Sequence, residues 1–117
     1  MRHKRGNKKL GKPTDQRIAL LRSLSLSLIE NQRIKTTDTR AKSAKRYVER
    51  LISLAKKGSL HGRREALKML PNANAVKKLF DDYAPKYKDR SGGYTRIIKL
   101  ADRRGDAATI SLLEFVE

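Results

Sequence analysis

An excess of positive charge sets the conditions under which this chain of 117 residues can form a compact domain. The sequence carries 29 lysines and arginines against 12 acidic residues, which gives a formal net charge of +17 at neutral pH. A compact fold with this surplus repels itself and is therefore most stable beside a polyanion. Nucleic acid is the common polyanion, and a sequence pI of about 10.6 lies in the range typical of nucleic-acid-binding domains.

The charge is unevenly distributed along the chain. The first thirteen residues hold six lysines and arginines and no acidic residue. Residues 33–50 hold seven basic against two acidic residues, and residues 86–106 hold seven against three. Residues 69–85, by contrast, balance two lysines with two aspartates. We therefore expect nucleic acid to contact the basic segments rather than the whole surface.

The composition also excludes several classes of site. Hydrophobic residues make up 38% of the chain, which predicts one domain with a lean core. There is no cysteine, so disulfides and thiolate metal sites are excluded. His3 and His61 lie far apart in the sequence and make a weak case for zinc. No metal and no cofactor is predicted.

No apolar run approaches the roughly 18 residues that signal a membrane span. The basic start also lacks the apolar stretch that follows it in a secretory signal. Binding to anionic lipid would favour Trp or Phe on an apolar face, and the chain has no Trp and only two Phe. We therefore expect the protein to work in the cytoplasm.

The first part of the chain divides into a basic arm and a helix. Residues 1–13 are predicted to form an arm without a core of its own, because like charge is dense and apolar content is almost absent. Thr14 is a plausible N-cap for a helix over 15–30, in which four leucines fall on one stripe. Residues 23–28 also alternate strictly between Ser and Leu, as in a strand, but the flanking residues continue the helical pattern. We therefore prefer the helix.

Three further helices are predicted. After a short β-prone run at 33–37, Thr37 or Asp38 caps the clearest helix in the chain, and Gly58 ends it. A third helix spans roughly 60–70 and is broken by Pro71. A fourth begins near Asn74, and Pro85 is expected to end it, because proline disfavours the helical conformation of the residue before it.

Two strands are predicted at 94–100 and 109–116, separated by a turn at Arg103-Arg104-Gly105-Asp106. They form a hairpin, and the run at 33–37 joins them in a three-stranded sheet. The fold class is therefore α+β: a two-layer domain over 14–117, with about four helices packed on a small three-stranded sheet and a basic N-terminal extension.

The segment Gly92-Gly93-Tyr94-Thr95-Arg96 permits two interpretations. Paired glycines let a backbone approach a ligand closely, while Tyr94 offers a stacking plane and Arg96 a bidentate phosphate contact. The alternative is an ordinary turn with an inward-packed tyrosine. Catalysis is not predicted: Gly11-Lys12 is followed by proline and not by a phosphate-binding loop, and the adjacent Asp81 and Asp82 point about 100° apart on a helix.

Several of these segments together resemble the bacterial large-subunit ribosomal protein family numbered seventeen. The resemblance covers essentially the whole chain, and its most specific parts are Met1-Arg2-His3, Ile34-Lys35-Thr36-Thr37 with Arg40-Ala41-Lys42, Lys78-Leu79-Phe80, Gly92-Gly93-Tyr94-Thr95-Arg96-Ile97 and Arg103-Arg104-Gly105-Asp106.

The resemblance implies a structural, non-catalytic ribosomal protein that binds large-subunit ribosomal RNA near the mouth of the peptide exit tunnel, beside neighbouring ribosomal proteins. It favours the arm, Gly92 to Arg96 and Arg103-Arg104 as RNA contacts. Basic residues of the predicted helices and strands are added to these. The predicted RNA-binding residues are Arg2, His3, Lys4, Arg5, Lys8, Lys9, Lys12, Arg17, Arg22, Lys35, Arg63, Arg64, Arg90, Gly92, Gly93, Tyr94, Arg96, Lys99, Arg103 and Arg104.

Two other classes of function remain as alternatives. A DNA-compacting architectural protein would bind duplex DNA and structured RNA equally well at matched salt. A small nucleic-acid-modifying enzyme would show turnover that survives extensive purification.

Overall fold

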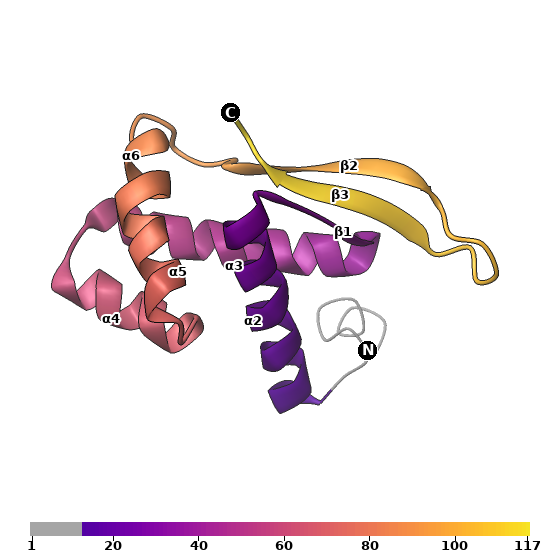
Figure 1. Ribbon diagram of the computed structural model, residues 1–117, viewed down its shortest axis with the longest axis horizontal. Coiled ribbons are helices and arrows are strands. Elements are labelled where there is room, and N and C mark those ends of the chain that lie inside the picture. The colour runs from indigo at the N-terminus through magenta and orange to yellow at the C-terminus, as the bar shows by residue number, and fades with distance from the viewer. Residues whose placement is uncertain (1–12) are drawn as a thin grey trace.

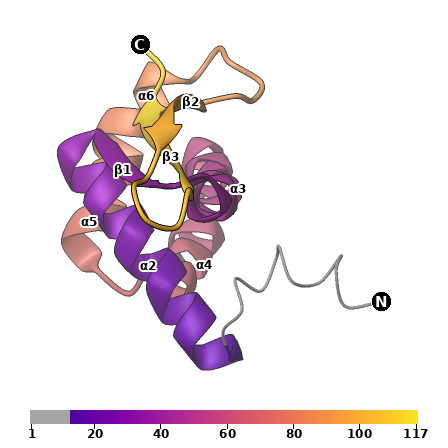
Figure 2. The same ribbon diagram turned by 90° about the vertical axis from the view of Figure 1, so that its right-hand side faces the viewer.

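The fold is known from a computed structural model that describes residues 13–117. Four helical segments and one three-stranded antiparallel sheet, in the order β1-β3-β2, make up this part of the chain. Figure 1 shows the sheet lying along α3, and Figure 2 shows α2 on the same side of the sheet as α3. The predicted two-layer α+β fold is therefore confirmed for the described residues.

Helix α2 spans Thr14–Asn31, so residues 23–28 are helical and the predicted helix is confirmed. The leucines at 24 and 28 are one helical turn apart, and the helix turns both towards the core. The predicted N-cap is wrong, because Pro13 occupies the cap position and Thr14 is already helical. The carbonyl of Pro13 accepts the first hydrogen bond, from the N–H of Arg17 at 2.9 Å. Proline suits this end, since its fixed φ is compatible with a helix start.

Strand β1, Arg33–Thr37, leads directly into α3, Asp38–Lys57. Helix α3 buries one continuous stripe at three- and four-residue steps, comprising Ala41, Ala44, Val48, Leu51, Ile52 and Ala55. As predicted, Gly58 ends the helix in the left-handed conformation, with φ 65°. Helix α3 packs against all three strands and against the other helices, so it is the centre of the domain.

Helix α4, Leu60–Met69, packs closely on the end of α3. The side chain of Ser59 caps it by accepting a hydrogen bond from the N–H of Gly62 at 2.9 Å. A Cβ atom at Gly62 would lie 2.9 Å from the carbonyl oxygen of Leu54, which is closer than such atoms approach. Glycine is therefore required at 62 by the contact between α3 and α4.

The last helical segment passes through Pro85, so the prediction that proline ends it is wrong. Helix α5 spans Ala73–Lys78, the π-helical turn η1 spans Leu79–Tyr83, and α6 spans Ala84–Lys86. In the wider turn, the N–H of Ala84 donates to the carbonyl of Leu79, five residues back. A π turn before Pro85 accommodates the helical path, because proline has no N–H to donate and its ring crowds the preceding turn of a regular α-helix.

Strands β2, Thr95–Asp102, and β3, Thr109–Phe115, form the predicted hairpin. Strand β3 is central, and its Leu113 lies between Ile34 of β1 and Ile97 of β2. Leu113 is fully buried and faces the helices. The pairing shifts between Lys99 and Ala101, so Leu100 is the extra residue of a β-bulge.

Four aromatic rings close the end of the core near the C-terminus. The centroids of Tyr83 and Phe115 are 4.2 Å apart, and those of Tyr87 and Tyr94 are 5.3 Å apart. The hydroxyl of Tyr83 donates to the carbonyl of Ile29 at 2.9 Å, and burial raises the pKa of Tyr83 to about 12. This cluster joins the last helical segment to α2 and to the sheet. Within residues 13–117, none of the helices is long and apolar enough to cross a membrane.

The central position of Leu113 can be tested by truncation. Leu113→Ala is expected to lower the free energy of unfolding by about 2–5 kcal/mol, because it leaves a cavity between the two layers. Leu60→Ala serves as the control, since Leu60 is 65% exposed. The control is expected to change the free energy of unfolding by less than about 0.5 kcal/mol in urea denaturation. Equal losses in the two variants would contradict the position of Leu113.

Candidate nucleic-acid interface

The predicted contact residues from 90 onwards lie on the loop before β2 and on the β2–β3 hairpin. Figure 1 shows that this hairpin extends past the N-terminal end of α3. Arg96, Lys99 and Arg104 are all exposed along it. Arg96 lies opposite Glu114 of β3, with Nη2 3.4 Å from Oε2, and its side chain is 53% exposed. The ion pair is long, so the guanidinium of Arg96 stays accessible to an anion.

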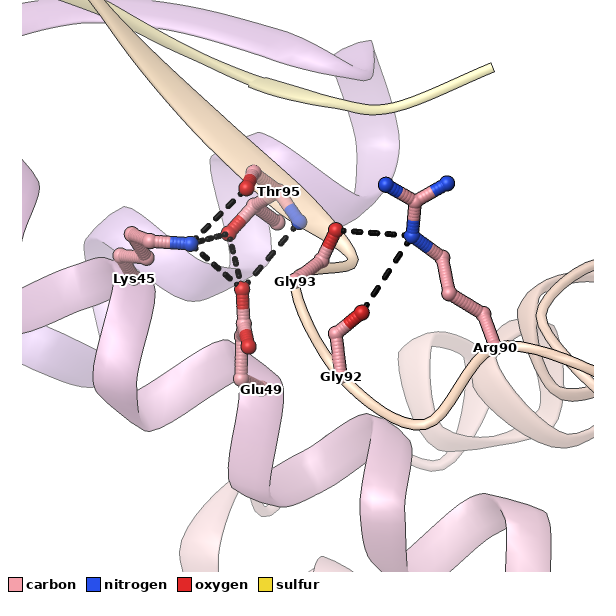
Figure 3. Close-up of polar contacts among 6 residues, drawn as sticks. All are labelled: Lys45, Glu49, Arg90, Gly92, Gly93 and Thr95. Carbon is pink, nitrogen blue, oxygen red and sulfur yellow. Dashed lines mark hydrogen bonds and ion pairs between the residues drawn. The ribbon is translucent and has the colours of Figure 1, made fainter.

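Arg90 shapes the loop that contains the paired glycines. Its Nε donates to the carbonyl of Gly92 at 3.3 Å and to that of Gly93 at 3.1 Å. Gly93 adopts φ 63°, a left-handed conformation that glycine permits at little cost. Figure 3 shows the two terminal nitrogens of Arg90 pointing away from these carbonyls. Arg90 therefore holds the loop with one nitrogen and leaves its outer N–H groups directed to the surface.

The start of β2 is held from below by Glu49 of α3 (Figure 3). Its carboxylate accepts hydrogen bonds from the hydroxyl of Thr95 at 2.8 Å and from the N–H of Thr95 at 3.2 Å. The ammonium of Lys45 donates to the same carboxylate at 2.7 Å and to the carbonyl of Thr95 at 2.8 Å. These contacts fix the strand between the glycine loop and Arg96.

Glu49 stays charged in this position. Burial would raise the pKa of its carboxyl group, but the hydrogen bonds from Lys45 and Thr95 outweigh burial and lower the pKa below its ordinary value of 4.5. At the N-terminal end of α3, Asp38 accepts a hydrogen bond from the hydroxyl of Ser111 at 2.8 Å and pairs with Lys42 at 3.1 Å. These two contacts, that of Ser111 above all, lower the pKa of Asp38. Both acids are thus engaged within the protein.

Tyr94 is inward-packed, so the second interpretation of the glycine segment is correct for this residue. Its ring is only 3% exposed and lies against Tyr87. Its hydroxyl accepts a hydrogen bond from the ammonium of Lys56 at 2.8 Å, and the same ammonium donates to the carbonyl of Arg90. A nucleobase has no access to a ring buried in this way. Tyr94 anchors the loop.

The hairpin turn carries one engaged arginine and one exposed arginine. Arg103 pairs with Asp106 at 2.6 Å, and this hydrogen bond is the main reason that the pKa of Asp106 falls to about 2. Gly105 adopts φ 95°, which completes the turn. Arg104 lies exposed between the members of the ion pair. Of the two predicted arginines here, Arg104 is therefore the more available to a ligand.

The predicted helix residues lie elsewhere. Figure 1 shows α4 at the opposite end of α3 from the hairpin tip. Arg22 of α2 donates to the carbonyls of Met69 at 3.1 Å and Lys68 at 2.8 Å, so it joins α2 to the end of α4. The guanidinium of Arg63 lies 4.5 Å from the centroid of the Phe80 ring. These two arginines have structural partners, so the structure does not bring them together with the hairpin residues.

The other predicted residues follow no common pattern. Arg64 is exposed on α4, Arg17 is half-buried on α2, and Lys35 is exposed on β1. Seven predicted contacts lie outside the described residues, namely Arg2, His3, Lys4, Arg5, Lys8, Lys9 and Lys12.

Three residues that shape the loop were not predicted: Lys45, Glu49 and Lys56. In the sequence these three residues are only charges on the polar faces of a predicted helix. The four-residue spacing of Lys45 and Glu49 indicates an ion pair along a helix. Their partner Thr95 lies 46 residues further on, however, and no local pattern reports such a contact.

The sequence is similar to a known family over most of its length. The family model described as "Ribosomal protein L17" matches residues 20–116. The chain is 53% identical over 111 residues to the "Large ribosomal subunit protein bL17" of Clostridium acetobutylicum, covering 95% of this chain and 97% of that protein. It is 51% identical over 109 residues to the protein of that name from Caldanaerobacter subterraneus, covering 93% and 97% of the two chains.

The role of Glu49 can be tested by its dependence on pH. A carboxyl group with a lowered pKa in the folded state stabilises the fold above its unfolded pKa, and that contribution is lost as pH falls through the folded value. Glu49→Gln is therefore expected to lower the free energy of unfolding at neutral pH by about 1 kcal/mol. The difference from the original protein should shrink as pH falls below 4.5, the ordinary pKa of the group.

The control for this experiment is Glu65→Gln, measured by urea denaturation across the same pH range. Glu65 lies on α4 in long, exposed ion pairs, 3.8 Å from His61 and 3.6 Å from Lys68. Such pairs contribute little to stability. An effect of Glu49→Gln that is constant down to low pH would contradict the assigned role of the carboxylate.

Proposed function

The chain belongs to the ribosomal protein L17 family, and from this premise we propose that it binds large-subunit ribosomal RNA and stabilises the folded form of that RNA. Membership of this family makes the protein a structural, non-catalytic component of the bacterial ribosome, and its place of action is the cytoplasm. The observation that carries the proposal is the family match over residues 20–116.

The distribution of charge supports RNA as the ligand. Asp38, Glu49 and Asp106 are engaged by groups of the protein itself. Arg90, Arg96 and Arg104 direct guanidinium groups to the surface from the loop and the hairpin. Guanidinium groups bind phosphate oxygens in a planar, two-pronged geometry. The loop and the hairpin are therefore the proposed RNA-binding surface of the described residues.

The position of Tyr94 favours binding to RNA phosphates over stacking on RNA bases. Sequence-specific recognition of single-stranded RNA uses bases stacked on aromatic rings, and here that ring is buried. Arginines on an exposed hairpin instead suit contacts to the phosphates of folded RNA, which fix position and orientation. The proposed role is to hold RNA segments in place by neutralising closely packed phosphates.

The finer location also belongs to the proposal. The resemblance of the sequence to its family implies a position near the mouth of the peptide exit tunnel, with other large-subunit ribosomal proteins as neighbours. Sedimentation of a cell lysate in high salt tests the assignment. We expect the chain to travel with the large ribosomal subunit, and a chain that remains free at the top of the gradient would overturn the proposed function.

Removal of single arginines tests the proposed surface. Arg96→Ala and Arg104→Ala are each expected to weaken binding to large-subunit RNA, because each loses one phosphate contact. The slope of log affinity against log salt concentration should fall by about 1 in each variant. Salt titrations with purified protein measure this slope, and thermal unfolding verifies that the variants are folded.

Lys77→Ala is the matched control. Lys77 is exposed on α5, in the segment where lysines and aspartates balance, and it is expected to leave the salt slope unchanged. Unchanged binding in both arginine variants would refute the assignment of Arg96 and Arg104. Equal affinity of the original protein for duplex DNA at matched salt would favour an architectural DNA-binding protein instead.

A further inference from the structure

The side of the sheet that faces away from α3 carries Arg96 at one end, and its other residues have no role in the proposed RNA binding. Its residues follow from the register of the strands: Arg33, Glu114 and Arg96 form one row, Lys35, Leu112 and Ile98 the next, and Thr37, Ile110 and Ala101 the third. The intervening rows contain the buried Leu113 and Ser111 and face the helices. Because side chains alternate along a strand, the three rows face the opposite way. We call them the outer sheet face.

The middle of the outer sheet face is apolar, and none of the elements within residues 13–117 covers it. Ile98 is 40% exposed, and Leu100, two residues further along β2, is 46% exposed. Leu112 and Ile110 of β3 lie beside them and are half-buried. Figure 1 shows α2, α3 and α4 on the other side of the sheet. Contiguous apolar side chains on a surface indicate a partner, whereas single scattered ones do not.

The chemistry of this surface favours a protein partner over RNA. Interfaces with nucleic acid are polar and depend on hydrogen bonds and charge. The side chains of Ile98, Leu100 and Leu112 offer neither. Apolar side chains of another protein would remove them from water, as in the core of an interface between proteins.

The rim of the outer sheet face indicates the charge of the partner. Arg33 and Lys35 of β1 border the apolar middle, whereas Arg96 at the end of the face is paired with Glu114 and assigned to RNA. A partner with acidic side chains would complement this rim. A second copy of the chain would not, because each copy carries a net charge of +17 and the two would repel.

We propose that the outer sheet face docks a segment of a neighbouring ribosomal protein, in which apolar side chains are flanked by acidic ones. This inference rests on the proposed function, since the neighbour is a component of the same subunit. The apolar residues of the segment cover Ile98, Leu100 and Leu112, and its acidic residues pair with the cations of the rim. Arg96, Arg90 and the hairpin tip remain available to RNA.

Photochemical cross-linking in the intact subunit tests the inference. Ile98 is replaced in cells by the photoreactive amino acid benzoylphenylalanine, the large subunit is isolated in high salt and illuminated, and the products are identified by mass spectrometry. We expect one cross-linked peptide from another ribosomal protein, with apolar and acidic residues. The control is the same replacement at Leu60 of α4, which is 65% exposed and is expected not to capture that peptide.

The contrary outcomes are distinct. A cross-link from position 98 to ribosomal RNA alone, to a second copy of the chain, or to nothing would overturn the inference while the chain still sediments with the subunit. Capture of the same peptide from position 60 would also overturn it. A chain that does not sediment with the subunit would instead overturn the proposed function, and the inference with it.

A second set of variants tests the charge of the partner. With the photoreactive group kept at position 98, Arg33→Glu is expected to abolish the cross-link, because the new carboxylate repels acidic side chains. Arg33→Gln should reduce it, and Lys77→Glu on α5 should leave it unchanged. Thermal unfolding identifies any variant that does not fold, and Arg33→Gln decides the question if Arg33→Glu is one of them. An undiminished cross-link in folded Arg33→Glu would overturn the acidic character of the partner.

Discussion

Two carboxylates on one helix connect the layers of this domain. Asp38 at the start of α3 bonds to Ser111 of β3, and Glu49 in its middle bonds to Thr95 of β2. In a chain with 29 basic and 12 acidic residues, carboxyl groups are scarce, and these two occupy the contacts that set the sheet on α3. They hold the start of β2 and the middle of β3 against α3. Two of the few carboxylates of a strongly cationic protein are thus used between its layers.

Much of the fold could be predicted because its signals are local. The apolar spacing in α3, the glycine after it and the turn between β2 and β3 are each visible in a short stretch of sequence. The continuation past Pro85 could not be predicted in this way. It depends on a π turn, and Tyr83 at the end of that turn packs against Phe115, 32 residues further along the chain. A local rule for proline does not include such a contact.

The candidate site shows the same division. Exposed cations such as Arg96 and Arg104 could be identified because charge is visible in the sequence itself. The positions of Arg22 and Tyr94 could not, because each depends on a partner far away in the chain: the carbonyl of Met69 for one, the ammonium of Lys56 for the other. Sequence therefore indicates which residues are suited to bind RNA, and tertiary contacts decide which of them are free to do so.

The bulge at Leu100 influences the direction in which the tip of the hairpin points. Lys99 still pairs with Ser111 and Ala101 with Ile110, so the extra residue lies between two intact pairs. Bulges bend a strand and increase its local twist. A relative that lacked this one residue would keep the same partners on both sides of the gap, yet its arginine-bearing tip would point in another direction. Deletion of a single codon can therefore change the direction of the tip, and with it the surface that the tip contacts, while the strand pairing of the sheet is kept.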